Sequence, residues 1–267
     1  MARFAEGSYR AVIGAGTLFA LVFMVAPTLV VLVTSFTGGN TLRFPPESYS
    51  LRWYGELFNN SPQLLAAARE SLVVAVWTTL ICVVLGTAGA YAISRSRSRL
   101  AGMLDAVFMS PMVLPSMAFG LALLLVLSVA GVSLGTWTLV AGHTVICTPF
   151  VLRMVSASVQ QLDGTLLQAS TGLGASPWFT FRHITLPLIK RGVVAGAFIA
   201  FLTSFDHVPV SLMLADPRSE TLPIHLWTLL ENNLDVRVAA VCGVLVAVTS
   251  VVAILFERMR RNSETIL

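Results

Sequence analysis

The chain has 267 residues, of which 56% are hydrophobic and only 11% are charged, and its mean hydropathy is +0.82. Soluble domains carry about 25% charged residues, because a folded surface has to be hydrated. A soluble enzyme, a disordered tail and a disulfide-rich secreted scaffold are therefore poor fits, and the composition indicates an integral membrane protein. The net charge of +4 does not indicate nucleic acid, because the basic residues are not gathered into a patch on a soluble face.

Stretches without charged residues, interrupted only once, are long enough to cross a bilayer as helices. We expect an all-α membrane protein with six such helices in a single domain covering residues 1–267. The turn-forming residues 131–135 divide a run that is too long for one span. The first stretch begins after basic residues, as a signal peptide does, but it is longer than a signal-peptide core and no clear cleavage site follows, so we expect it to be retained. The six expected spans are residues 11–36, 71–94, 106–130, 135–152, 192–215 and 238–256.

The basic residues predict the orientation, because loops rich in Lys and Arg stay in the cytoplasm. If the N-terminus is inside, five of the seventeen basic residues lie outside, namely Arg43, Arg52, Arg69, Arg218 and Arg237. The other twelve lie inside: Arg3, Arg10, Arg95, Arg97, Arg99, Arg153, Arg182, Lys190, Arg191, Arg258, Arg260 and Arg261. We therefore expect both termini to be cytoplasmic.

Residues that could bind metal or nucleotide are scattered. Cys82, Cys147 and Cys242 lie far apart in apolar stretches without metal-ligand spacing, so we expect buried packing residues. His143 and His207 are expected to be buried and hydrogen-bonded rather than metal ligands or proton relays. The chain has no G-x-x-x-x-G-K-[ST] loop to hold a nucleotide phosphate. No metal site and no cofactor of its own are expected.

The loop at residues 163–187 carries the main functional signal. Asp163 is a suitable N-cap for a short helix that runs to about Thr171, and Ser176 followed by Pro177 begins a second short helix. On these residues alone the loop is either an interfacial helix that rests on lipid headgroups or a docking element for a soluble partner.

Within this loop, Q-A-S at 168–170, Gly174 and the pair Leu186-Pro187 resemble the EAA motif of binding-protein-dependent ABC importer permeases. Gln168 stands where the family has Glu, and Ser170 stands where it has the second Ala. The segments P-M-V-L-P at 111–115, S-F-D at 204–206 and T-L-P at 221–223 are also similar to this family. The similarity extends from the first span to the sixth and is closest to the second permease subunit of spermidine/putrescine-type importers.

The resemblance implies a type I ABC importer permease fold in the bacterial cytoplasmic (inner) membrane, with a cytoplasmic coupling helix. The implied partners are a sister permease subunit, two ATPase subunits that hold ATP and Mg, an extracytoplasmic solute-binding protein and the lipid bilayer. A neutral Gln168 offers weaker hydrogen bonds to the ATPase than a Glu would. The ATPase-coupling residues that it implies are Gln168, Ala169, Ser170, Gly172, Gly174, Ala175, Leu186 and Pro187.

The expected translocation pathway or gate residues are Ser204, Asp206, Pro111 and Pro115. Asp206 is the single formally charged residue within an expected span, and a carboxylate in lipid is costly unless it faces a cavity or a partner. Its role is either to line the pathway, where it could attract a cation, or to be structural, as a hydrogen-bonded tie between helices or a neutral acid. The resemblance at residues 204–206 favours a gate or structural role over direct binding of the solute. The prolines free carbonyl groups and bend their helices. Gly192 and Gly196 permit close helix contact, within this chain or between subunits.

The function we expect is that of an importer permease subunit without enzymatic activity, with a polyamine as its solute. The outer loops are acidic, which favours a cation, while ferric iron and aminoethylphosphonate are alternatives within the same class. An ATP-independent channel or secondary transporter is the alternative from another class, but it would need internal repeats or several intramembrane ionisable groups. An intramembrane enzyme would need paired catalytic residues, and none is evident.

Overall fold

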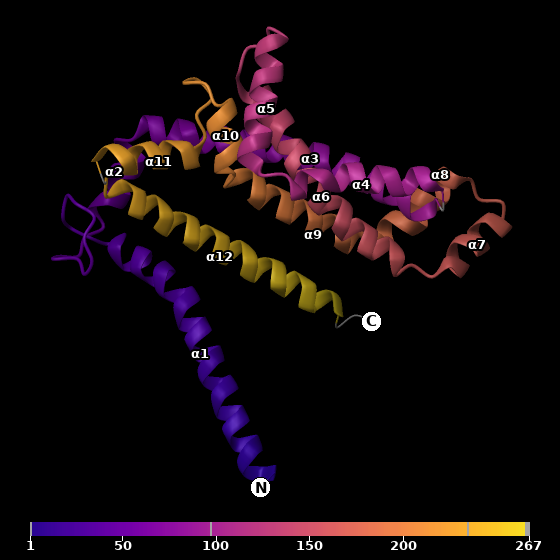
Figure 1. The fold of residues 1–267 in the computed structure, drawn as a ribbon, viewed down its shortest axis with the longest axis horizontal. Helices are drawn as coiled ribbons and strands as arrows, with labels where there is room; N and C mark the ends of the chain where they lie inside the picture. The colour runs from indigo at the N-terminus through magenta and orange to yellow at the C-terminus, as the bar shows by residue number, and fades with distance from the viewer. Residues whose placement is uncertain (1, 97, 234, 265–267) are drawn as a thin grey trace. The chain divides into compact units, whose positions relative to one another are not determined.

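The computed structural model describes residues 2–96, 98–233 and 235–264, so Arg97, one of the twelve bases expected inside, lies outside the described residues. Within them the fold is helical, with one isolated bridge between Thr37 and Tyr49 (Figure 1). The chain divides into two compact units, residues 1–63 with 226–267 and residues 64–225. The helices are α1 Ala2–Thr34, α2 Arg52–Asn59, α3 Pro62–Arg95, α4 Arg99–Val113, α5 Ser116–Val129, α6 Thr136–Gln160, α7 Gly164–Gly172, α8 Pro177–Thr180, a π-helical turn η1 Phe181–Thr185, α9 Leu186–Phe205, α10 Val208–Leu214, α11 Leu222–Asn233 and α12 Arg237–Glu264.

Four helical stretches in the described residues are long and apolar enough to cross a membrane, or five if one bent pair counts as a single span. The expected spans 11–36, 71–94 and 135–152 fall mainly on α1, α3 and α6. The fourth helical stretch is Pro177–Phe205, and the described apolar part of α12, Arg237–Val252, is shorter. A multi-pass membrane protein is consistent with these lengths.

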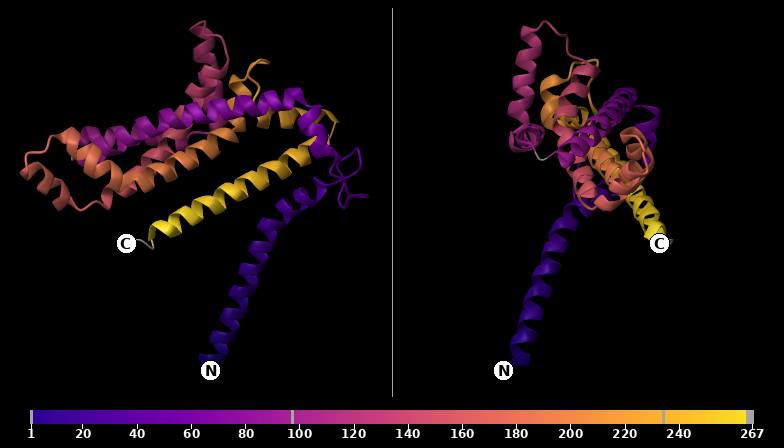
Figure 2. Two further views of the ribbon diagram at one scale, coloured as in Figure 1. Left: turned by 180° about the vertical axis from the view of Figure 1, so that it is seen from behind. Right: turned by 90° about the vertical axis from the view of Figure 1, so that its right-hand side faces the viewer.

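The expected span 106–130 is broken into α4 and α5, which meet at an angle of 105°. The break falls on Leu114, which has φ −76° and ψ 139°, directly before Pro115. The ring of a proline excludes the helical conformation from the residue that precedes it, so the helix ends there. Figures 1 and 2 show α5 pointing away from the common direction of α3, α6 and α9, with α10 beside it.

The expected span 192–215 is also broken, at its only acidic residue. Helix α9 ends at Phe205, Asp206 follows with φ −104° and ψ 13°, and α10 begins at Val208. Pro209 lies in the first turn of α10, where its missing N–H group costs no helical hydrogen bond. The apolar segment therefore contains a real gap in its backbone hydrogen bonding, next to a carboxylate.

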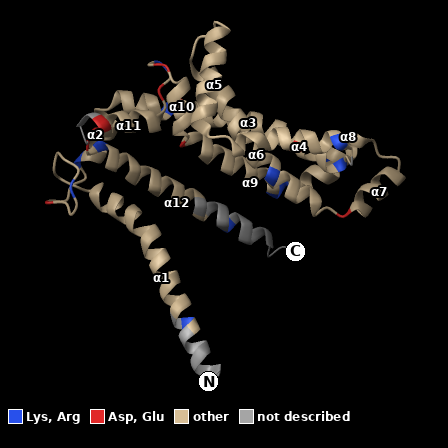
Figure 3. Cartoon of the chain, in the orientation of Figure 1, with Lys and Arg blue, Asp and Glu red and all other residues tan. Residues whose placement is uncertain are grey.

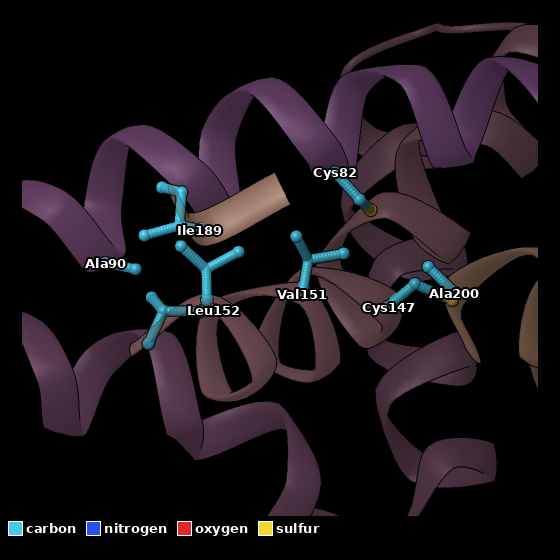
Figure 4. Close-up of a cluster of buried hydrophobic side chains, with 8 residues drawn as sticks. Cys82, Ala90, Cys147, Val151, Leu152, Ile189 and Ala200 are labelled. Atoms are coloured by element: carbon cyan, nitrogen blue, oxygen red, sulfur yellow. The ribbon is translucent and has the colours of Figure 1, made fainter. Parts of the chain in front are cut away.

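Helix α6 provides the centre of the unit formed by residues 64–225. Its buried residues contact those of α3 and α9 in one apolar cluster (Figure 4), which consists of Cys82, Ala90, Cys147, Val151, Leu152, Val155, Ile189 and Ala200. Cys82 and Cys147 are buried packing residues, as expected, whereas Cys242 is half-buried. A second cluster joins α3, α6 and α10 through Val74, Leu139, Val140, Ile146, Val210 and Leu214.

Glycines let α6 and α9 approach each other closely. A Cβ atom added at Gly196 would lie 2.9 Å from the Cα atom of Val151, and one at Gly192 would lie 2.7 Å from the carbonyl oxygen of Met154. Both glycines are buried. Gly192 and Gly196 therefore permit a close contact within this chain, which is one of the two alternatives that the sequence left open for this pair.

The unit formed by residues 1–63 and 226–267 contains polar contacts just after the C-terminal end of α1 and at the start of α12. The hydroxyl groups of Ser35 and Tyr54 are 2.8 Å apart, and Gly243 of α12 leaves room for both. Arg237 donates to the carboxylate of Asp235 at 2.6 Å and to the hydroxyl of Ser61 at 3.4 Å. Burial of Asp235 opposes ionisation, but the hydrogen bonds from Arg237 outweigh it and lower the pKa of this carboxyl.

Changing Gly196 to Ala should destabilise the protein by about 1–3 kcal/mol, because the added methyl group would press on backbone atoms of α6 that cannot move aside. Thermal unfolding in detergent measures this as a lower midpoint temperature. Gly16→Ala is the matched control, since its Cβ would meet nothing within 4 Å and Ala favours helix more than Gly does. Equal midpoints for the two variants would contradict the close contact.

Candidate functional site

The loop at 163–187 forms the first expected short helix, α7, and then turns at an elbow. The expected second short helix is not separate: α8 is the first turn of a continuous helical stretch that runs from Pro177 to Phe205. The backbone N–H of Thr165 donates to the carboxylate of Asp163 at 2.9 Å, which caps α7 and lowers the pKa of Asp163. The N–H of Phe179 donates to the hydroxyl of Ser176 at 3.3 Å, which caps α8. Gly174 has φ +80°, a conformation that glycine adopts without strain, and turns the chain between the helices. The capping pattern is therefore confirmed.

A buried hydrogen bond closes the elbow. The hydroxyl groups of Ser170 on α7 and Thr180 on α8 lie 2.7 Å apart, and both residues are buried. The N–H of Ala175 also donates to the carbonyl of Ser170 at 3.1 Å. Ser170, at the position of the second Ala of the family motif, thus fixes the angle of the elbow and is not available to a partner.

The rest of the α7 surface is open. Gln168, Ala169, Gly172 and Gly174 are exposed, while Ala175 is half-buried. Large apolar side chains near them are exposed as well: Leu173 by 88% and Trp178 by 67%. Figure 1 shows α7 at the end of its unit, beyond α8. The elbow therefore presents two backbone-accessible glycines, a neutral amide and apolar side chains on one protruding segment.

The loop joins α9 without a break in the helix. Leu186 and Pro187 are exposed, and Ile189 in the next turn is buried in the main apolar cluster. A proline inside a helix cannot donate a hydrogen bond and clashes with the preceding turn. The π-helical turn η1 accommodates this, because the N–H of Leu186 donates to the carbonyl of Phe181, five residues back. Phe181 also lies 5.0 Å from the ring of Tyr91 on α3, which links the loop to the bundle.

A second group of polar side chains surrounds the break between α9 and α10. Nδ1 of His143 lies 2.9 Å from the hydroxyl of Ser204 on α9, and Nε2 lies 3.0 Å from the hydroxyl of Ser211 on α10. All three residues, which we call the His143 clasp, are buried. A serine hydroxyl can donate or accept, so both ring nitrogens of a neutral histidine are satisfied. The clasp joins the two halves of the broken span to α6.

His207 completes the connection at the break. Its Nδ1 accepts a hydrogen bond from the N–H of Val210 at 3.4 Å and so caps α10. Its ring lies 5.3 Å from that of His143. The two histidines are thus buried, hydrogen-bonded residues, as expected. The described residues contain no group of three or more His, Cys, Asp or Glu that could hold a metal ion.

Asp206 faces a cavity of about 510 Å³ at the same break, lined by Leu202, Thr203, Asp206, His207, Val208 and Pro209. Ser204 lies two residues away but is turned inward to His143. Pro111 and Pro115 do not line this cavity. The structure therefore brings Asp206 to an open, largely apolar pocket, assigns Ser204 to the clasp, and leaves the two prolines near the α4–α5 break.

The sequence does not reveal the partners of these residues. Ser204 and Ser211 are seven residues apart, which suggests a common helix face, but nothing in the chain pairs them with His143, more than sixty residues earlier. Thr180 is likewise an ordinary residue of a short helix until its contact with Ser170 is seen.

Comparisons with known proteins agree with this architecture. Residues 82–262 match the family model of the binding-protein-dependent transport system inner membrane component. The chain is 31% identical to the spermidine/putrescine transport system permease protein PotC of Escherichia coli (strain K12), over 90% of each chain. It is 26% identical to the putative 2-aminoethylphosphonate transport system permease protein PhnV of Salmonella paratyphi A, over 96% of each.

A solved structure shares the fold. The crystal structure of a bacterial ABC transporter involved in import of the acidic polysaccharide alginate contains a chain that superposes with a TM-score of 0.70. The two chains are 13% identical, and the match covers 96% of this chain and 97% of the other. The family match covers residues 82–262, and the relatives match along nearly the whole length of the chain. The chain therefore belongs to the family of inner-membrane permease components of binding-protein-dependent transport systems.

Proposed function

We propose that this chain is one of two permease subunits of an ATP-driven importer, and that it moves a polyamine delivered by an extracytoplasmic binding protein. The similarity to a spermidine/putrescine permease along 90% of the chain carries this proposal. The sister permease, the binding protein and two ATPase subunits are its proposed partners. ATP and Mg belong to the ATPase subunits, and both termini of this chain are cytoplasmic.

The elbow of α7 and α8 is the proposed docking element for the ATPase. Three features support this role: the elbow is braced internally by Ser170 and Thr180, it projects from its unit, and its outer surface carries Gln168 and Ala169. A rigid projection transmits motion, whereas a loose loop absorbs it. Gly172 and Gly174 allow a partner to approach the backbone, and Leu173 and Trp178 supply apolar area for burial.

Asp206 is the proposed pathway residue. Its carboxylate lines a cavity at a break in an apolar segment, and such breaks are where transporters place their solute contacts. A carboxylate in a cavity attracts the ammonium groups of a polyamine, which is consistent with the acidic outer loops. Ferric iron and aminoethylphosphonate stay as alternative solutes of the same importer class, and an ATP-independent channel or secondary transporter is the alternative class.

Changing Gln168 tests the docking role. Gln168→Glu should strengthen ATPase binding by about tenfold, because a charged acceptor makes hydrogen bonds roughly twice as strong as a neutral one. Gln168→Ala should weaken binding, and Ala169→Arg should abolish it by placing a large charged side chain in the contact. Retention of the ATPase during purification in detergent, with titration of purified ATPase, measures these changes.

Gln161→Arg is the control for Ala169→Arg, since Gln161 is also exposed but precedes α7. All variants should unfold at the wild-type temperature, because none of the three positions is buried. An unchanged affinity in every variant would remove α7 from the ATPase contact. Solute uptake by reconstituted protein in the absence of ATP would contradict the importer class itself.

Changing Asp206 tests the pathway role. Asp206→Asn should lower ATP-dependent uptake at least about tenfold, since the amide keeps the size of the side chain but loses its charge, while ATPase binding stays at the wild-type level. Uptake of labelled spermidine into proteoliposomes provides the measurement. Ser204→Ala, which loosens the His143 clasp but keeps the carboxylate, separates charge from positioning. Normal uptake by Asp206→Asn would show that this carboxylate is not in the pathway.

A further inference from the structure

A second cavity, of about 370 Å³, lies away from the Asp206 break, at the end of the unit where α6 leads into α7. Its walls come from the end of α3, the first turns of α4 and the last turns of α6. They consist of Ile93, Ser94, Ser96, Ser98, Ala101, Gly102, Asp105, Arg153, Ser156 and Gln160. Neither the proposed docking element nor the proposed pathway uses this cavity.

The cavity contains opposite charges that do not neutralise each other. Asp105 on α4 and Arg153 on α6 both line it, yet neither forms an ion pair or hydrogen bond with any residue that the structure describes. Ser94, Ser156 and Gln160 add polar side chains that likewise have no hydrogen-bond partner among the described residues. An acid and a base held apart across one pocket are complementary to a ligand that carries both an anion and a cation.

The cavity lies at the boundary between polar and apolar surface. Asp105 immediately precedes the apolar run 106–130, and Arg95 ends the apolar helix α3. Just outside the cavity, α4 exposes apolar side chains, including Met103 (65%) and Val107 (66%). Figure 3 shows that charged residues are few in this unit and that long stretches of its helices are uncharged. In a membrane protein such a boundary is the level of the lipid headgroups, with acyl chains alongside the helix.

We propose that this cavity binds the headgroup of a zwitterionic phospholipid with a primary ammonium group, that is, phosphatidylethanolamine. Arg153 and the hydroxyl groups of Ser94 and Ser156 bind the phosphate, because a guanidinium group pairs well with phosphate oxygens. Asp105 accepts hydrogen bonds from the ammonium group. The acyl chains extend over the apolar surface of α4. The proposal depends on the membrane location of the chain and not on its solute or its ATPase.

The predicted selectivity follows from the two charged residues. Phosphatidylcholine has a phosphate but a quaternary ammonium group without N–H donors, so it cannot donate to Asp105. Phosphatidylglycerol has a phosphate but no cation, which leaves Asp105 facing the negative charge. Phosphatidylethanolamine should therefore bind about tenfold more tightly than either, which corresponds to ~1.4 kcal/mol.

Native mass spectrometry of the full complex, titrated with each of the three lipids in detergent, tests this. Arg153→Gln should lower the occupancy by phosphatidylethanolamine about tenfold, since a charged hydrogen bond to phosphate is lost. Asp105→Asn should remove the preference over phosphatidylcholine. Arg99→Gln is the control for Arg153→Gln, because Arg99 is an exposed base at the start of α4 that does not line the cavity, and this change should leave occupancy unchanged.

Gly102→Phe supplies a steric test that does not alter charge. A Cβ atom at Gly102 would meet nothing within 4 Å, so the ring can enter the cavity without straining the fold and should displace the lipid. A thermal unfolding midpoint at or above that of the wild type would show that this variant folds. Soluble phosphoethanolamine, added at the same concentration, should not displace the lipid, because it lacks the acyl chains.

Three results would overturn the proposal. Equal occupancy by all three lipids, or tighter binding of phosphatidylglycerol, would show that net charge alone attracts lipid to this surface. Unchanged occupancy in both Arg153→Gln and Gly102→Phe would place the lipid elsewhere. Displacement by soluble phosphoethanolamine would mean that the cavity serves a small soluble zwitterion rather than a membrane lipid.

Discussion

The packing of residues 64–225 depends on the close approach of α6 and α9. In lipid there is little hydrophobic force between helices, because lipid chains are as apolar as leucine, so stability comes from tight packing and from hydrogen bonds. Gly192 and Gly196 bring the two backbones together, and Gly86 allows α3 to approach Val151 in the same way. The buried cluster of small and β-branched side chains around α6 follows from this spacing (Figure 4).

The break at Asp206 is an exception to this tight packing, because a cavity lies beside it. An interrupted helix leaves backbone groups without partners, and such an interruption is tolerated in a membrane where it borders a cavity or buried polar groups. Here both occur: the cavity on one side and the His143 clasp on the other. The clasp holds the ends of α9 and α10 while leaving the carboxylate of Asp206 free to face the cavity.

The elbow also combines satisfied backbone groups with a buried polar contact. Its caps, Asp163 and Ser176, satisfy N–H groups at the start of α7, which is too short to be stable alone, and at the start of the helical stretch Pro177–Phe205. The contact between Ser170 and Thr180 then joins them, and the π-helical turn before Pro187 connects the elbow to α9. In the proposed function, motion of a docked ATPase would thus be passed to α9, which packs on α6 and ends at Phe205, directly before Asp206.

Composition and motifs along the chain were enough to predict the membrane class, the family resemblance, the approximate positions of three of the six expected spans and the capping residues of the elbow. These depend on composition and on neighbours along the chain, which are local properties. The sequence alone did not determine that the spans 106–130 and 192–215 are broken, although Pro115 and Asp206 mark both places. The packing of the helices against one another was needed to show that Ser204 faces His143, that Ser170 is buried against Thr180, and that Asp105 and Arg153 line the same cavity. Each of these depends on which helices pack together, and helical periodicity shows which residues share a face but not what that face meets.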